Sequence, residues 1–171
     1  MTVYLLDTNY LVYLADDDSD EEKRKAVLSD MAKKLQQDDN RFVITPLIRY
    51  EVLRGVDWGK SEKLSRLTGV LAQFESLDIT QNVSDLASDL YRFDKFEAER
   101  DKTPKNLEKR KFDMFHYATA RVNNLEILSH DTDVNKIRDL HERMQVMQAK
   151  ESLESWVIGD YIDIDFFKNG F

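Results

Sequence analysis

The sequence predicts an α/β protein with a mainly parallel central sheet wrapped by helices. Short apolar runs that suit buried strands recur at 2–6, 41–45 and 125–129, with weaker candidates at 77–80 and 143–148. Segments with apolar residues at helical spacing fill the intervals between them. Strands that alternate with helices form parallel sheets, because each crossover needs a helix. We therefore expect a twisted sheet of four or five strands.

The expected helices follow the strands in order. They cover 20–37, a segment that begins at Pro46 with Thr45 as its N-cap, 61–74, 83–99 and a segment that ends near Asn123. More helix lies between the second and fourth strands than one crossover requires, so we expect an inserted helical arm at about 61–101. The domain then covers 1–158. The acidic and aromatic tail of 159–171 suits an edge strand, an arm docked on a partner subunit, or a segment packed on its own domain.

Composition limits the classes of function. The chain has 171 residues, no cysteine and a net charge of −8, which fits one domain without disulfides or thiol chemistry. No apolar run is long enough to span a bilayer, and the first one breaks at Asp7, so we expect a cytoplasmic protein. The negative charge argues against a surface that coats nucleic acid. Basic residues gather locally at 23–34 and 102–111, as binding sites or as solvated helix faces.

Two aspartates follow predicted strands. Asp7 ends the first apolar run, and Asp131 follows the strand at 125–129. In parallel sheets, ligands bind beyond the carboxyl ends of the strands, so both residues are candidates for one crevice. Each also has a simpler interpretation, because aspartate is a frequent N-cap and turn residue. Asp133 lies two residues further on, in an expected loop.

Two more acids lie on inward faces of predicted helices. Glu51 shares the apolar face of Leu47 and Ile48, and Asp113 opens the almost wholly apolar segment 112–120. An unpaired buried charge costs several kcal/mol, so each carboxylate needs a cation. The simpler interpretation is that each carboxylate forms a local salt bridge with a basic residue on the same helix. Arg49 or Arg54 would then pair with Glu51, and Lys109 or Arg110 with Asp113.

Together these acids indicate a metal site. Two carboxylates ~4 Å apart repel by about 4 kcal/mol at an effective dielectric near 20, so several together call for a multivalent cation. Oxygen ligands without thiols favour Mg²⁺ or Mn²⁺ over zinc. Carboxylate clusters of this kind hold metal ions that activate water in phosphodiester hydrolysis.

Four stretches resemble the PIN-domain ribonucleases, in particular the toxins of VapBC-type toxin–antitoxin pairs. They are Tyr4-Leu5-Leu6-Asp7-Thr8-Asn9, the segment from Ile44-Thr45-Pro46 to Glu51 and Gly55, the segment Phe112-Asp113 to Ala120, and Ile127-Leu128-Ser129-His130-Asp131-Thr132-Asp133. The segments Val146–Ala149 and from Glu151 onwards look like the last strand and closing helix of that family. The resemblance implies a three-layer α/β/α PIN-like fold.

The resemblance also implies a function. It makes the chain an Mg²⁺- or Mn²⁺-dependent endoribonuclease, with a small antitoxin protein as partner and a tendency to form homodimers. Its metal-binding and catalytic acids would be Asp7, Glu51, Asp113 and Asp131, with Asp133 as an auxiliary acid. Thr8 or Asn9 would steady the first acid or a bound water. Residues that would contact RNA are Lys109, Arg110, Lys111 and His116.

Other functions remain open. A PIN domain without activity would bind RNA or a protein, and a PIN nuclease of RNA processing would have no antitoxin. A haloacid-dehalogenase-type phosphotransferase needs a second aspartate two residues after the first, where this chain has Asn9. Zinc hydrolysis would use His116, His130 or His141, but no two of these have ligand spacing on one helix.

Overall fold

The computed structural model describes residues 2–16, 19–37, 39–103, 106–129 and 133–168, and the side chains of 107–109 and 154–168 lie outside this description. The elements in chain order are β1 (Val3–Leu6), α1 (Thr8–Ala15), α2 (Glu21–Leu35), β2 (Arg41–Ile44), α3 (Pro46–Arg54), α4 (Ser61–Leu71), β3 (Glu75–Ser76), α5 (Gln81–Arg100), α6 (Leu107–Val122), β4 (Glu126–Leu128) and α7 (Asp133–Lys168). The predicted α/β class is confirmed.

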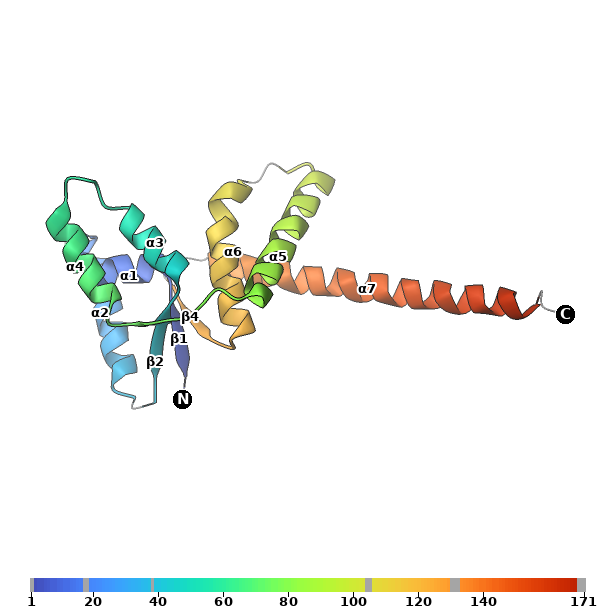
Figure 1. Cartoon of the computed structure of the whole chain (residues 1–171), viewed down its shortest axis with the longest axis horizontal. Coiled ribbons are helices and arrows are strands. Elements are labelled where there is room, and N and C mark those ends of the chain that lie inside the picture. The colour runs from blue at the N-terminus through green and yellow to red at the C-terminus, as the bar shows by residue number, and fades with distance from the viewer. Residues whose placement is uncertain (1, 17–18, 38, 104–105, 130–132, 169–171) are drawn as a thin grey trace.

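The described strands form one all-parallel sheet in the order β3-β2-β1-β4. Helices α1 to α4 gather on one side of it and α5 to α7 on the other (Figure 1). The carboxyl ends of β1, β2 and β4 therefore meet at one edge. They lead into Asp7, Thr45 and Ser129, so the central strands bring polar groups from distant parts of the chain together.

Capping residues fix where the helices begin. The Asp7 carboxylate accepts from the Thr8 N–H at the start of α1, and the Thr45 hydroxyl accepts from the Ile48 N–H, with Pro46 at the first helical position of α3. Both caps sit at the carboxyl end of a strand, so each strand passes directly into a helix. This tight passage holds the first turns of α1 and α3 beside each other at the sheet edge.

The core has two main parts. Leu5, Leu6 and Ile44 of the sheet pack with Leu11 of α1 and Ile48 of α3, all almost fully buried. On the other side, α5, α6 and α7 contribute Leu90, Met114, Tyr117, Ile137, Leu140 and Met144. Ile127 of β4 touches both parts. Helix α6 is thus held firmly by apolar contacts, which fixes the polar side chains that it carries.

Three predictions about secondary structure were wrong. Residues 143–148 are helical, because α7 runs without a break from Asp133 to Lys168 and takes in Val146–Ala149 and the tail up to residue 168. Asp133 opens that helix rather than lying in a loop. The third strand lies at Glu75–Ser76, just before the predicted 77–80.

Helix α7 leaves the α/β body after its first third. Among its described side chains the buried ones, such as Ile137 and Met144, lie near its start, whereas Val146 and Leu153 are more than half exposed. The rest of the helix projects away from the body (Figure 1). Within the described residues no helix is both long and apolar enough to cross a membrane. The division of the chain at residue 158 stays a prediction.

Candidate active site

Asp7 lies at the carboxyl end of β1, and hydrogen bonds fix its carboxylate. Its Oδ1 accepts from the Thr8 N–H at 2.8 Å, and its Oδ2 accepts from the Ser129 hydroxyl at 2.7 Å. The Asp7 N–H donates to the Leu128 carbonyl at 3.0 Å, which ties this residue to β4. Each carboxylate oxygen can accept more than one bond, so Asp7 keeps acceptor capacity toward the sheet edge.

Glu51, on α3, is held in place by two donors from other elements. Its Oε2 accepts from the Thr8 hydroxyl at 3.0 Å and from Nε2 of His116 at 2.5 Å. The carboxylate is only 11% exposed, and Arg54 approaches its other oxygen at 3.9 Å. The predicted salt bridge between Arg54 and Glu51 is therefore present, but it is longer than the hydrogen bonds from Thr8 and His116.

The pKa of Glu51 reflects these contacts. Burial raises it, whereas the hydrogen bond and charge of His116 lower it, followed by the Thr8 hydrogen bond and the Arg54 charge. The result is a pKa below the ordinary value for glutamate. Glu51 is thus an ionised acceptor at neutral pH, and His116 Nε2 carries the proton of their hydrogen bond.

Asp113, on α6, stands in a different environment. Among the described residues no hydrogen bond or ion pair reaches its carboxylate. Burial raises the pKa of Asp113 to about 6; His116 opposes this rise, and the charges of Asp7, Glu51 and Asp133 add to it. Three acids, from the end of β1, from α3 and from α7, are therefore close enough to influence Asp113 on α6. Their mutual repulsion is what a bound cation would relieve.

The predicted cation for Asp113 is engaged elsewhere. Arg110 donates through Nη1 to Asp94 at 2.6 Å, and the Asp94 side chain is fully buried between α5 and α6. The Lys109 side chain lies outside the described residues. Lys111 is exposed, with its Nζ 5.4 Å from the centre of the Phe112 ring. The RNA-binding role of this segment stays a prediction, and Arg110 has a structural partner.

The last acids come from the segment after β4. Asp131 lies outside the described residues, so its predicted place in the site is untested. Asp133 is the first residue of α7, and Lys136 Nζ lies 2.5 Å from its Oδ1. Asp133 nevertheless influences the pKa of Asp113 and so belongs to the same neighbourhood.

The donor set fits a hard divalent cation. All four described acids offer oxygen ligands, and Asp113 faces three other carboxylates. Within the described ranges no three of these side chains converge closely enough to form a complete metal-binding group. The predicted ligands of Mg²⁺ or Mn²⁺ are Asp7, Glu51, Asp113, Asp131 and Asp133, and this assignment stays a prediction.

Two supporting residues were not anticipated in these roles. Ser129 orients Asp7, and His116 holds Glu51 while its own Nδ1 is buried without a hydrogen-bond partner in the described structure. Their positions in the sequence were the signals that could have identified them. Ser129 lies at a strand end two residues before Asp131, and His116 lies one helical turn after Asp113. Thr8 contacts Glu51 with its side chain, and Asn9 is exposed on α1.

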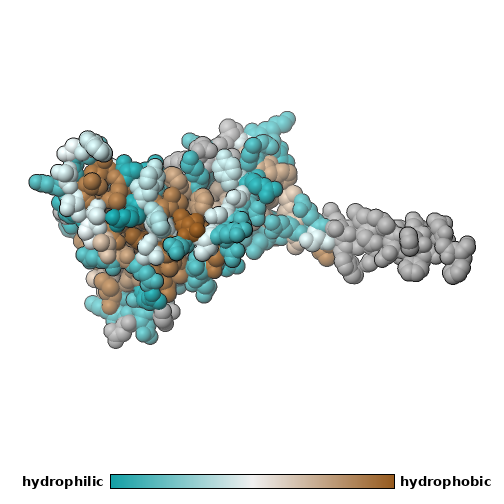
Figure 2. All heavy atoms as spheres, in the orientation of Figure 1, coloured by the Kyte–Doolittle hydropathy of each residue, from teal (hydrophilic) through white to brown (hydrophobic). Residues whose placement is uncertain are grey.

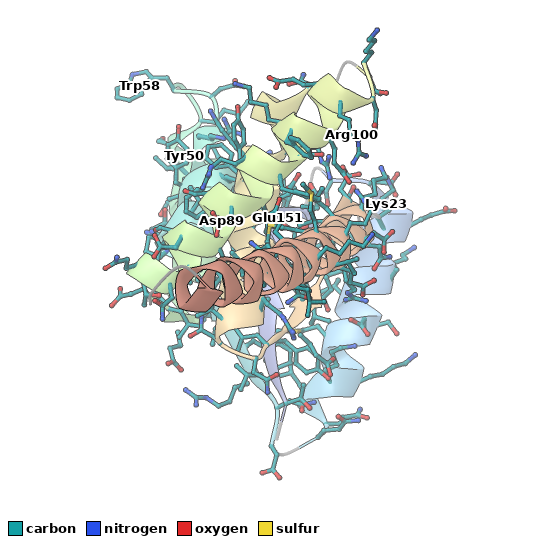
Figure 3. All side chains as sticks on the ribbon, turned by 90° about the vertical axis from the view of Figure 1, so that its right-hand side faces the viewer. Lys23, Tyr50, Trp58, Asp89, Arg100 and Glu151 are labelled. Carbon is teal, nitrogen blue, oxygen red and sulfur yellow. The ribbon has the colours of Figure 1, made fainter. Side chains whose placement is uncertain are left out.

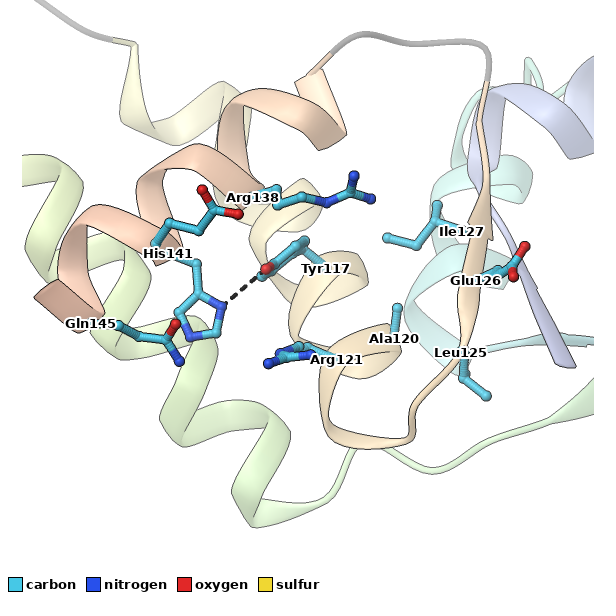
Figure 4. A pocket seen from close by; sticks show the side chains of 10 residues that line it. Tyr117, Ala120, Arg121, Leu125, Glu126, Ile127, Arg138, His141 and Gln145 are labelled. Atoms are coloured by element: carbon cyan, nitrogen blue, oxygen red, sulfur yellow. Dashed lines mark hydrogen bonds between the residues drawn. The ribbon is translucent and has the colours of Figure 1, made fainter. Parts of the chain in front are cut away.

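The described histidines do not form a zinc site. His116 contacts Glu51, whereas His141 accepts or donates through Nδ1 at 3.0 Å from the Tyr117 hydroxyl. His141 lines a separate hollow of about 570 Å³ between β4, α6 and α7 (Figure 4). Arg121 and Arg138 also line this hollow, and none of the four described acids does.

An all-parallel sheet with carboxylates near its carboxyl edge places acids where α/β proteins bind their ligands. The PIN domain family matches residues 4–140, and the chain therefore belongs to this family of nucleases. No curated protein matches the sequence significantly.

Three solved structures share the fold. VapBC2 from Rickettsia felis, bound to a DNA fragment from their promoter, has 20% sequence identity and a TM-score of 0.57 over 79% of this chain and 92% of that chain. FitAcB from Neisseria gonorrhoeae has 17% identity and a TM-score of 0.56 over 80% and 93%. VapBC-1 from nontypeable Haemophilus influenzae has 15% identity and a TM-score of 0.55 over 81% and 93%. The predicted resemblance to VapC-like PIN proteins is confirmed.

Proposed function

We propose that this protein is an Mg²⁺- or Mn²⁺-dependent endoribonuclease and the toxin of a type II toxin–antitoxin pair in the cytoplasm. The observation that carries the proposal is the half-buried Asp113, whose pKa is raised by burial and by three neighbouring acids. In a site that serves only stability, a basic side chain such as arginine or lysine would pair with this carboxylate. A carboxylate without a basic partner is available to bind a divalent cation, which can promote hydrolysis of a phosphodiester.

The chain's own residues would divide the work as follows. Asp7 and Asp113 would present oxygens to the cation, with Asp7 oriented by Ser129 and the Thr8 N–H. Glu51 would hold its position through Thr8 and His116, and Asp131 and Asp133 would complete the set. The chemistry that a divalent cation supplies when bound here is activation of water and stabilisation of the leaving oxygen.

Cleavage of single-stranded RNA with Mg²⁺ or Mn²⁺ tests this function. Wild type should cleave, and Asp7→Asn should lose at least 100-fold in rate while keeping its fold, because the amide removes the charge but keeps the shape. Asp85→Asn is the matched control, since Asp85 is exposed on α5. RNA binding without cleavage by wild type would indicate a binding module instead. Cleavage that survives Asp7→Asn would place the chemistry elsewhere.

The antitoxin is a separate part of the proposal. The VapBC2 and FitAcB structures share this fold, and the sequence resembles the toxins of VapBC-type pairs. Exposed apolar residues such as Val146 and Leu153 on the projecting part of α7 support association with another protein chain or a second copy. Co-expression with the protein encoded by the adjoining reading frame should inhibit cleavage at one-to-one stoichiometry. If the protein stays monomeric and its cleavage is not inhibited, the proposed toxin role is wrong and the proposed nuclease activity is unaffected.

A further inference from the structure

A cluster of aromatic rings and cations lies directly beside the acids. The guanidinium of Arg54 lies 5.7 Å from the centre of the Tyr50 ring and 5.3 Å from that of Phe112. The two rings meet edge to face, with centroids 6.3 Å apart and planes inclined by 69°. Tyr50 comes from α3 and Phe112 from α6, so the cluster bridges the two helices that carry Glu51 and Asp113.

The cluster is continuous with the candidate active site. Arg54 lies 3.9 Å from Glu51, and Tyr50 and Phe112 each precede one of the site acids in the sequence. It is also open to solvent, since Tyr50 is 54% exposed and the Arg54 side chain 52%. The face of the molecule in Figure 2 shows apolar surface between the α3 side and α6 and more hydrophilic surface around it.

The chemistry of the cluster suits one kind of occupant. A nucleobase stacks on an exposed aromatic ring, a guanidinium stacks on the base or the ring, and nearby cations attract the phosphates. Lys111, over Phe112, adds a second positive charge in a chain of net charge −8. The rings of this cluster are accompanied by cations and not by aliphatic side chains. This combination suits binding of single-stranded nucleic acid better than binding of an apolar protein segment.

We propose that Tyr50, Arg54 and Phe112 form a stacking platform that binds a base of single-stranded RNA next to the scissile phosphate. This inference rests on the proposed nuclease function and deepens it. The platform positions the substrate: stacking fixes the register of the strand, and the distance from ring to acids sets which phosphate reaches Asp7 and Asp113. Double-stranded RNA, whose bases are already stacked, is a poor substrate for such a site.

The test combines a protein variant with an abasic RNA. We expect removal of one base beside the cleavage site to lower kcat/KM of wild type by roughly 5- to 100-fold, the range of one lost stacking contact. Tyr50→Leu should lower kcat/KM on intact RNA by a similar factor and show no further loss on the abasic RNA. If Tyr50 has only a structural role, kcat/KM of Tyr50→Leu should still fall when the base is removed from the RNA.

The chain offers a matched control. Phe96, on α5, is 41% exposed, stacks against Phe93 and lies 5.8 Å from the guanidinium of Arg100, so it repeats the ring–arginine pairing far from the acids. In the view of Figure 3, Arg100 lies at the upper right, apart from Tyr50 at the upper left. Phe96→Leu should behave as wild type on both RNAs.

The outcomes separate the platform from the nuclease. If Tyr50→Leu keeps the full abasic penalty or cleaves intact RNA normally, the platform is wrong and the nuclease stands. If this variant instead loses only antitoxin binding, the cluster is a protein-docking surface and the platform is again wrong. If wild type cleaves no RNA, the proposed function fails. The platform is then judged by binding of the same two RNAs, where a base dependence that Tyr50→Leu removes supports it and its absence overturns it.

Discussion

Replacing Asp113 with asparagine should abolish cleavage and stabilise the metal-free protein. Asparagine has the shape of aspartate but no charge, so it cannot be repelled by Asp7, Glu51 and Asp133. Most changes at buried polar positions lower the free energy of unfolding. The expected gain here is therefore a specific signature of an acid that is held in an unfavourable environment for the sake of a ligand.

The magnitude follows from the pKa. The difference between the ordinary aspartate value of 3.8 and about 6 in the folded protein corresponds to ~3 kcal/mol at ~1.4 kcal/mol per pH unit. Because Asp113 is partly exposed, solvent screening reduces this to roughly 1–2 kcal/mol. The folded state holds a proton that the unfolded state has lost between about pH 4 and 6, so the stability of wild type falls as pH rises through this window.

Thermal unfolding of wild type and Asp113→Asn without divalent ions measures this effect. At pH 7.5 the variant should melt roughly 2–8 °C higher, and near pH 4 the difference should vanish because wild-type Asp113 is then protonated. Added Mn²⁺ should stabilise wild type more than the variant. Asp85→Asn should show neither effect. A variant that is less stable than wild type at pH 7.5, or a gain independent of pH, would refute the reasoning.

Three further predictions concern the neighbours of these acids. Thr8→Val removes the hydroxyl that donates to Glu51 and should lower kcat/KM by roughly 10–100-fold, whereas Thr8→Ser keeps the donor and most of the activity. His116→Gln removes an interaction that lowers the pKa of Glu51, so the acid limb of the pH–rate profile should move to higher pH; an unmoved limb would contradict this role. Arg110→Met removes a charge partner of the fully buried Asp94 and should cost roughly 2–4 kcal/mol in urea unfolding, and a cost below 1 kcal/mol would show that this pair is dispensable.

The order of strands and helices could be predicted because local signals agreed with tertiary structure. The apolar runs before Asp7 and Thr45 are short, end in capping residues and lie in the middle of the sheet. Residues 143–148 misled because a run with Val146 and Met147 resembles a strand when read alone. The helix that starts at Asp133 continues through it, since nothing in that run caps or breaks a helix.

Candidate acids could be predicted, but not their partners. Strand ends and inward helix faces identify where carboxylates gather, because these features depend on local periodicity. Partner choice depends on how α5 packs against α6, which sequence spacing does not reveal. Arg110 lies one turn before Asp113 and was one of the two cations predicted for Asp113. Because α5 packs against α6, Arg110 forms its salt bridge with Asp94 instead.

Described basic side chains pair with the buried acids elsewhere in the protein and with Glu51 and Asp133, but not with Asp7 or Asp113. Asp94 pairs with Arg110 at 2.6 Å, Glu97 with Arg143 through two bonds of 2.8 Å, and Asp16 with Lys63 at 2.6 Å. Among the described residues, Asp7, which is also buried, receives only the Ser129 hydroxyl and an N–H, and the carboxylate of Asp113 receives no partner. Among the described side chains, these two acids lack the basic partner that the structural acids have. Repulsion contributes to the raised pKa of Asp113 at this edge of the sheet, and a divalent cation is the partner that we propose for it.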